Sequence, residues 1–339
     1  YADKNGSNAV DHAVYADSRI VKENYDLSSE LFDDIKKVSY YDEILSKNTV
    51  EENYNNHFDT VLKREFVNRM GYWNLQNSIK DDDTGEAKEA IKWIFNDQEN
   101  LQLFIETGNV GDSLKCVSLL KELYSKHKDD LNDQTQGDVY KKMMIALAIA
   151  YSTDRNGSPL SFNMQPNSYD ALKRYEIIKN LYDSGLFARK DEFSTYNMEL
   201  IRMVMNDSIS NDEIDWLRHY SQSRHGTDLN KALNPYNYMH YVSPNYAQDK
   251  LYDANNKETY DTKYQLSKYN IPYGLNSDGT KTSRTWMVME AGGICWNISR
   301  LGQNLNRVYG IPTVGIYQPA HESYFTYSQN SDGKGIWSI

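Results

Sequence analysis

The sequence has few cysteines, no concentration of basic side chains and no long apolar run. Its 339 residues include 37 Lys and Arg against 48 Asp and Glu, which gives a formal net charge of −11. The longest basic clusters, such as Lys141-Lys142, are isolated. Because phosphate recognition needs a clustered basic surface, we expect no nucleic-acid partner. No stretch of about 18 apolar residues occurs, so we expect no helix that spans a membrane.

Cysteine is scarce, with two residues in the chain. A single disulfide would satisfy that count, but the two residues lie in different contexts. Cys116 belongs to an apolar helical stripe that continues to Leu123, and we predict that it is a core residue. Cys295 instead follows two glycines. We therefore expect two free thiols, and a cysteine retained in a chain that uses so few suggests a chemical role.

Aliphatic side chains are also few, and the mean hydropathy is −0.76. The 28 Tyr, 9 Phe and 6 Trp compensate for them, because each ring buries a large area while Tyr and Trp can keep a polar tip in water. The composition therefore predicts a folded protein rather than a disordered one. The length predicts two domains or one large one.

Periodicity divides the chain into three parts. Residues 1–25 are polar and without a period, which predicts a loosely ordered lead-in. Residues 26–225 repeat apolar positions every three or four residues and predict a helical domain, centred on the nearly all-apolar segment 143–150. The composition changes near Gly226, where Tyr, Asn, Asp and Gly become frequent and aliphatic residues become few. Residues 226–339 are therefore expected to form a second domain.

Two local features within these parts predict specific structure. Ser168 is expected to cap a helix that runs to about Asp183 and stops at Gly185. Residues 234–238 and 243–246, which are rich in Tyr, Asn and Pro, are expected to form ordered, aromatic-packed loops.

A pattern near the C-terminus joins a cysteine to a histidine. Cys295 begins a helical period that Gly310 closes. The elements expected after it are a strand at Thr313–Gln318, a strand opened by His321, a hairpin turn at Asn330–Gly333 and a third strand from Ile336. A helix of about 15 residues runs roughly 22 Å and a strand of about six returns roughly 20 Å. An antiparallel arrangement therefore brings His321 back to Cys295.

The place of Cys295 at a helix start suits nucleophilic chemistry. Free N–H groups and the helix dipole favour an anion there, and the thiolate is the nucleophilic form. An imidazole alongside can take the thiol proton, and Gly292-Gly293 would let the backbone come close to a substrate. We predict that Cys295 and His321 are catalytic. The alternative is that Cys295 is a small buried side chain and His321 a sheet-edge residue.

Gly293-Ile294-Cys295-Trp296, the helix after it, Gly310-Ile311-Pro312-Thr313 and the strand leading into His321 resemble the core of the transglutaminase-like superfamily. The resemblance implies an α+β protein with a papain-like core, in which the helix that carries the cysteine packs on an antiparallel sheet. That sheet carries the histidine and then an Asp or Asn. Leu172–Tyr175 and Glu213–Arg218 are more weakly similar to large bacterial proteins in which a helical region precedes such a core.

The resemblance implies a Cys295 thioester that serves in cross-linking, deamidation or peptide cleavage on a protein or peptide carboxamide. The backbone N–H of Cys295 and an upstream Gln or aromatic residue would hold the oxyanion. Gly293, Trp296 and Trp286 are expected near that region, although either tryptophan could equally be a core residue. No histidine pair has metal-ligand spacing, so we expect no metal and no other cofactor.

The third catalytic residue should lie opposite His321 at about position 341, so the core at 226–339 is expected to be truncated at its C-terminus. Glu322 and Asp332 are substitutes within the chain. However, Glu322 should point to the opposite face, and Asp332 suits a turn. His240 could line the cleft, although packing is the preferred interpretation. Asp81–Asp83 could hold calcium, although a solvated loop is preferred.

A second function stays open. The fold could be an inactive surface module whose Tyr- and Trp-rich loops, from Tyr236 to Tyr273, bind a glycan or a protein. A third interpretation is that Cys295 tethers another chain covalently. The resemblance, the acidic balance and the Tyr/Asn-rich texture favour an extracellular or cell-surface location.

Overall fold

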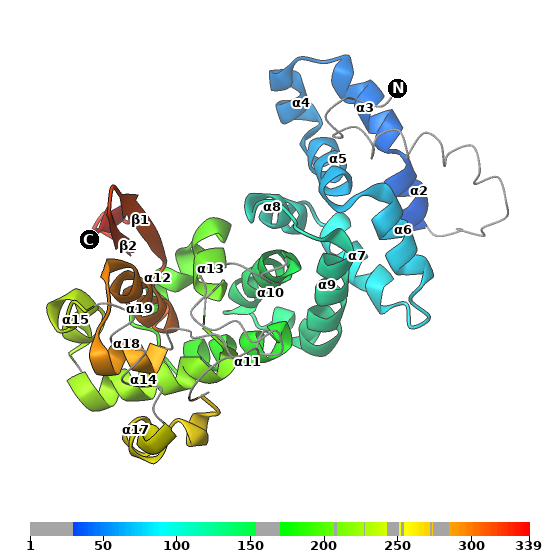
Figure 1. Ribbon diagram of the computed structural model, residues 1–339. Coiled ribbons are helices and arrows are strands. Elements are labelled where there is room, and N and C mark those ends of the chain that lie inside the picture. The colour runs from blue at the N-terminus through cyan, green and yellow to red at the C-terminus, as the bar shows by residue number, and fades with distance from the viewer. Residues whose placement is uncertain are drawn as a thin grey trace, which may run out of the picture.

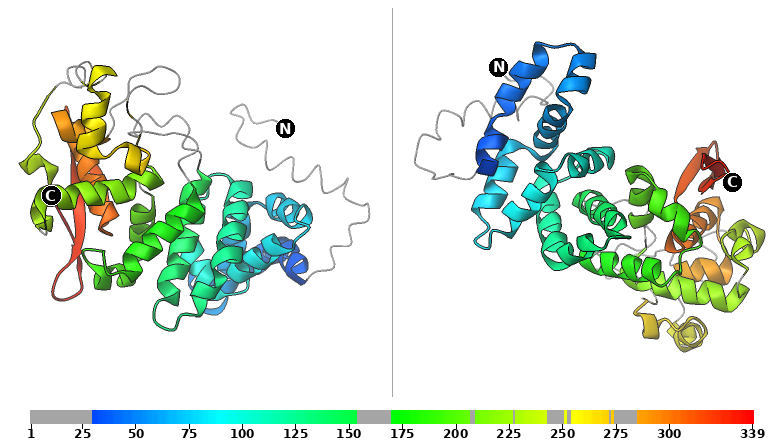
Figure 2. Two further views of the ribbon diagram at one scale, coloured as in Figure 1. Left: turned by 90° about the horizontal axis from the view of Figure 1, so that it is seen from below. Right: turned by 180° about the vertical axis from the view of Figure 1, so that it is seen from behind.

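A computed structural model describes residues 30–153, 170–206, 209–226, 228–242, 251, 254–271, 273 and 285–339. The predicted lead-in at 1–25, the predicted cap Ser168 and the predicted loop at 243–246 lie outside these ranges. Many helices are followed by a small sheet, so the described part of the chain is of the α+β class (Figure 1). Helices α2 to α6 and the sheet lie at opposite ends of the molecule (Figures 1 and 2).

The helices before residue 226 account for most of the described chain. They are α2 (Glu30–Lys36), α3 (Val38–Ser46), α4 (Val50–Asn56), α5 (Phe58–Met70), α6 (Tyr72–Lys80), α7 (Glu86–Phe95), α8 (Gln98–Glu106), α9 (Ser113–His127), η1 (Lys128–Asn132), α10 (Gly137–Ser152), α11 (Ala171–Asp183), α12 (Lys190–Thr195), α13 (Met198–Met205) and α14 (Asn211–His225).

The elements after residue 226 are shorter until the last helix. They are α15 (Leu229–Ala232), η3 (Pro235–Asn237), η4 (Ala254–Asn256), α17 (Lys257–Tyr264), η5 (Ser267–Tyr269), α18 (Thr285–Ala291), α19 (Cys295–Val308), β1 (Thr313–Gln318), β2 (His321–Gln329) and β3 (Gly335–Ser338).

Short polar side chains fix where several helices begin. Asp97, Asp112 and Asn197 each accept a hydrogen bond from a backbone N–H three residues on. Asp170 does the same for α11, so the prediction that this helix begins after Ser168 was two residues early. Ser210 forms a reciprocal capping box with Glu213 at the start of α14.

The core is continuous from Leu31 to Tyr309. At its centre, α10 is buried nearly all round, as the apolar segment 143–150 predicts. Cys116 on α9 is fully buried, which confirms that it is a core residue, and burial raises the pKa of its thiol. Both cysteines are free, as expected.

Two buried arginines join the helices that lead to the C-terminal region. Arg174 on α11 donates to the side chain of Asn211 at 2.7 Å and to the carbonyl of Ile209 at 2.6 Å. Arg218 on α14 donates to the carbonyl of Val308, the last residue of α19, at 2.7 Å. The two segments that resemble bacterial helical regions therefore supply polar contacts inside the fold.

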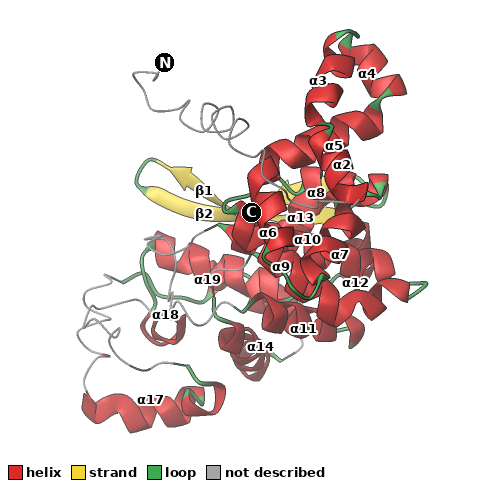
Figure 3. Cartoon of the chain, turned by 90° about the vertical axis from the view of Figure 1, so that its right-hand side faces the viewer, coloured by secondary structure: helices red, strands yellow, loops and turns green. Residues whose placement is uncertain are grey.

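The sheet confirms the predicted strands and hairpin. Its order is β1-β2-β3, with both pairs antiparallel and Gln318 opposite His321. Helix α19 packs on the sheet at Gly302, where an added Cβ would lie 2.2 Å from the Tyr324 ring. The Ser299 hydroxyl donates to the carbonyl of Ser323 at 2.8 Å. Figure 3 shows the strands beside the helices from a further side.

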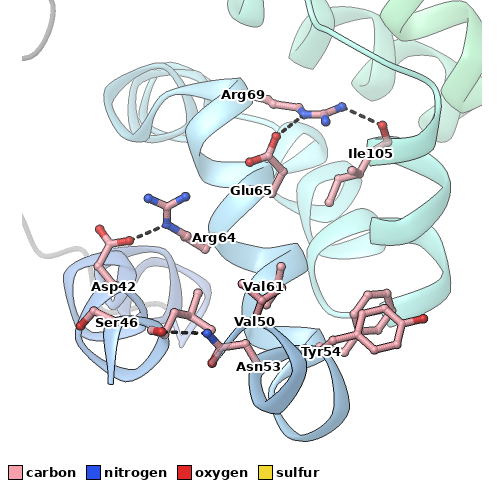
Figure 4. A pocket seen from close by; sticks show the side chains of 12 residues that line it. Asp42, Ser46, Val50, Asn53, Tyr54, Val61, Arg64, Glu65, Arg69 and Ile105 are labelled. Atoms are coloured by element: carbon pink, nitrogen blue, oxygen red, sulfur yellow. Dashed lines mark hydrogen bonds and ion pairs between the residues drawn. The ribbon is translucent and has the colours of Figure 1, made fainter. Parts of the chain in front are cut away.

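An apolar groove of about 750 Å³ lies between α3, α4, α5 and α8, at the end of the molecule away from the sheet (Figure 4). Its charged side chains pair with one another. Arg64 lies 2.5 Å from Asp42, and Arg69 lies 2.7 Å from Glu65. The groove therefore offers apolar walls but no unpaired charge from these residues.

In the acidic run at 81–83, Asp81 and Asp83 are exposed, as the preferred solvated loop predicts, but Asp82 is not. The Asp82 side chain is 5% exposed and bonds to the Lys121 ammonium at 2.7 Å. It also accepts from the Thr84 hydroxyl and the Ala87 N–H, both at 2.6 Å. Burial alone would raise the pKa of this carboxyl. The three hydrogen bonds and the Lys121 charge outweigh burial, so the pKa is lowered.

We expect Asp82→Ala to lower the free energy of unfolding by about 1–2 kcal/mol, because a hydrogen bond to the first turn of α7 and a partly buried ion pair are lost together. Urea denaturation measures this loss, and Asp83→Ala, which changes the exposed neighbouring aspartate, is the control. Since the folded pKa lies below the unfolded value, the difference between Asp82→Ala and wild type should be complete above about pH 4 and shrink below it. Equal losses in both variants would contradict the specific role of Asp82.

Candidate thiol site

Cys295 is the first residue of α19 and is partly exposed, which confirms the predicted helix start. The backbone N–H of the residue before it, Ile294, donates to the Asn297 side chain at 3.3 Å. The helix also ends as predicted, with Gly310 at φ +77°. Cys295 therefore occupies the N-terminal position of a helix, as the sequence predicts.

The segment before the cysteine is held by a stretch about 50 residues earlier. The N–H of Gly293 donates to the carbonyl of His240 at 3.0 Å, and the N–H of Val242 donates to the carbonyl of Gly293 at 3.1 Å. Gly292 has φ +82°, and an added Cβ would lie 2.0 Å from the His240 carbonyl oxygen. These glycines thus make their close approach to the chain itself, and not to open space for a substrate as the sequence suggested.

This pairing brings Tyr241 to the cysteine. Its hydroxyl accepts a hydrogen bond from the backbone N–H of Cys295 at 2.8 Å. A hydrogen bond with the Cys295 side chain raises the pKa of the Tyr241 phenol, which therefore stays protonated at neutral pH. The side chain is 61% exposed. Sequence reasoning expected an upstream Gln or aromatic here but had no signal to select this tyrosine among 28.

A second tyrosine connects the cysteine to the strand that begins with His321. The Tyr236 hydroxyl lies 3.0 Å from the carbonyl oxygen of Cys295 and 2.6 Å from that of Glu322. The two carbonyl oxygens are thus no more than about 5.6 Å apart. The Tyr236 ring centroid lies 6.4 Å from that of His321. Burial raises the pKa of Tyr236, which keeps the hydroxyl a donor.

His321 is exposed at the start of β2, whereas Glu322 is 3% exposed and faces α19, as the alternation of a strand predicts. The Glu322 carboxylate lies 3.3 Å from Nε of Arg300 and accepts from Ser299 at 3.4 Å. Burial is the largest influence on this carboxyl and raises its pKa, despite the Arg300 charge. The Glu322 side chain therefore connects β2 to α19 and does not orient His321.

The third catalytic residue predicted from the resemblance is not among the described residues near His321. Asp332 is exposed in the hairpin turn. Strand β3 pairs with β2 only from Thr326, opposite Ser338, to Gln329. If the same register continued toward the start of β2, about position 343 would lie opposite His321. This is two residues beyond the expected position 341.

The two tryptophans have different environments. Trp286 on α18 is fully buried and stacks on Tyr273, with centroids 5.3 Å apart, so it is a core residue. Trp296 is partly exposed in the first turn of α19 and packs against the core. His240 is exposed and lines a separate pocket with Gly292.

No protein-family model, curated protein or solved structure matches this chain. The resemblance to the transglutaminase-like superfamily thus depends on the residues themselves. Within the described ranges, no group of three His, Cys, Asp or Glu side chains could hold a metal ion. None of the helices in those ranges is long and apolar enough to cross a membrane.

Proposed function

We propose that this protein carries out thiol-dependent acyl transfer or hydrolysis on a protein or peptide carboxamide, with a papain-like arrangement of α19 and the sheet. His321 takes the thiol proton, and the Cys295 sulfur attacks the carbonyl carbon. The amine leaves with that proton and a thioester forms. Water or a second amine then attacks the thioester, and its proton returns to the sulfur through His321.

The observation that supports this proposal most is the bridge made by Tyr236. One hydroxyl contacts the backbone of Cys295 and that of Glu322, the residue after His321. The thiol and the imidazole therefore extend from backbone segments that meet at one point. A cysteine at a helix start with a histidine alongside is the arrangement that activates a thiol.

Tyr241 suits the role of second oxyanion donor. Its hydroxyl is 2.8 Å from the Cys295 N–H and carries a proton of its own. A substrate carbonyl oxygen that replaces the Tyr241 hydroxyl as the acceptor of this N–H would accept from the N–H, and a small shift of the tyrosine would let its hydroxyl donate to the same oxygen. Charge that develops on that oxygen in the transition state is stabilised by two such donors.

Alkylation tests the proposal without a known substrate. At pH 7 we expect iodoacetamide to modify Cys295 about tenfold faster than a model thiol, of which only a few per cent is thiolate. His321→Ala should remove this advantage. His219→Ala, which deletes an exposed imidazole on α14, is the control and should not change the rate. Mass spectrometry separates Cys295 from the buried Cys116.

Alkylation at the rate of a model thiol, and the same in His321→Ala, would reject the enzyme. The fold would then have the outline of the site without its chemistry. Binding of a glycan or protein by the aromatic loops would become the better hypothesis.

A further inference from the structure

A polar pocket of about 380 Å³ lies beside the backbone that supports Cys295 and is lined in part by Gly292 and His240. Its walls come from α14, α17, α18 and the segment 238–240, and Gly292 forms part of it. His240 lines this pocket, while the next residue, Tyr241, contacts Cys295. The pocket therefore lies next to the stretch of chain that contacts Cys295. The volume is within the range of small-ligand sites.

The pocket contains an excess of positive charge. Lys263 lies 2.5 Å from the Glu290 carboxylate, which also accepts from the Tyr264 hydroxyl, so these two charges offset one another. Arg224 has no carboxylate within 4.0 Å among the described residues of the chain. In a protein with net charge −11, a guanidinium without a carboxylate partner in the described part of the chain is a local reversal of sign.

Aromatic rings hold the Arg224 guanidinium in place. It lies 5.3 Å from the centroid of the Tyr238 ring and donates to the Tyr220 hydroxyl at 3.0 Å. A guanidinium held in this way keeps other N–H groups free, and its planar fork matches a carboxylate. The Met239 and Met289 side chains add apolar surface that can contact the methylene groups of a ligand that carries such a carboxylate.

We propose that this pocket binds an acidic side chain of the peptide substrate, a few residues from the carboxamide presented to Cys295. The inference rests on the proposed function, which supplies the peptide. Arg224 would pair with the substrate carboxylate, and the tyrosine rings would enclose its stem. The site would thus prefer a carboxamide in an acidic sequence, despite the negative charge of the whole protein.

Binding to the full chain with Cys295→Ala tests this, because no turnover can then occur. Labelled peptides carry one Gln as the reactive residue and one Glu at one to five residues on either side. Each has a matched peptide with Gln in place of that Glu. Fluorescence anisotropy gives the Kd. At the preferred spacing we expect the Glu peptide to bind about tenfold more tightly than its match, as charge-assisted hydrogen bonds predict.

Arg224→Gln should abolish this preference, and Arg224→Lys should keep part of it. Lys268→Gln removes an equal charge from η5, outside the pocket, and should leave the preference intact. Equal binding of Glu and Gln peptides at every spacing would overturn the proposal. So would an equal loss in Lys268→Gln, which would indicate general electrostatic attraction. Because this assay uses no thiol and the alkylation assay uses no peptide, either proposal can fail alone.

Discussion

Tyr241→Phe should slow the acylation of Cys295 by p-nitrophenyl acetate by about 100- to 1000-fold, the usual effect of removing one oxyanion donor. The ester carbonyl becomes a tetrahedral oxyanion when the thiolate attacks it. In the wild type, the Cys295 N–H donates to the Tyr241 hydroxyl at 2.8 Å, and both groups would turn to the oxyanion when it displaces that contact. Phenylalanine keeps the ring and removes one of the two donors.

Alkylation of the same thiol separates this role from a general change in the site. Iodoacetamide reacts by displacement at carbon and forms no oxyanion, so Tyr241→Phe should change its rate by less than about threefold. Tyr40→Phe, which alters a tyrosine 57% exposed on α3, is the control for acylation. Equal slowing of both reactions would instead mean that Tyr241 acts by positioning Cys295.

Arg218→Met should lower the free energy of unfolding by about 3 kcal/mol, because it removes a guanidinium that donates to the buried carbonyl of Val308 and to the part-buried carbonyl of Leu186. The guanidinium donates to Val308 at 2.7 Å and to Leu186 at 2.9 Å, and lies 4.3 Å from the Tyr309 ring centroid. Burial lowers the pKa of Arg218, but guanidinium groups keep their charge in proteins. That charge lies at the negative end of the α19 dipole, which adds to the stabilisation.

Urea denaturation measures this loss. Gln222→Met, one turn further along α14 on an exposed position, is the matched control and should change stability by less than about 0.5 kcal/mol. Because Arg218 ties α14 to the end of the helix that carries Cys295, the variant should also reduce the alkylation advantage of Cys295. A loss no greater than that of Gln222→Met would mean that water replaces the guanidinium at both carbonyls.

The sequence alone determined the local structure around the site. The strand at Thr313–Gln318, the hairpin turn at Asn330–Gly333 and the helix from Cys295 were all predicted from residue order. These features depend on alternation, turn residues and helix stops within a few positions of one another. The burial of Cys116 and of the segment 143–150 follows from the same periodicity.

Only the tertiary structure decided which side chains meet the thiol. Tyr241 and Tyr236 lie 54 and 59 residues before Cys295, and nothing local distinguishes them from the other tyrosines. The pairing of Gly293 with His240 and Val242 brings Tyr241 to the helix start. Glycine at position 292 permits this pairing, because an added Cβ there would collide with the His240 carbonyl oxygen. The burial of Trp286 and the contacts of Arg224 with Tyr238 and Tyr220 likewise depend on the tertiary structure. Non-local packing sets such contacts, and periodicity does not encode them.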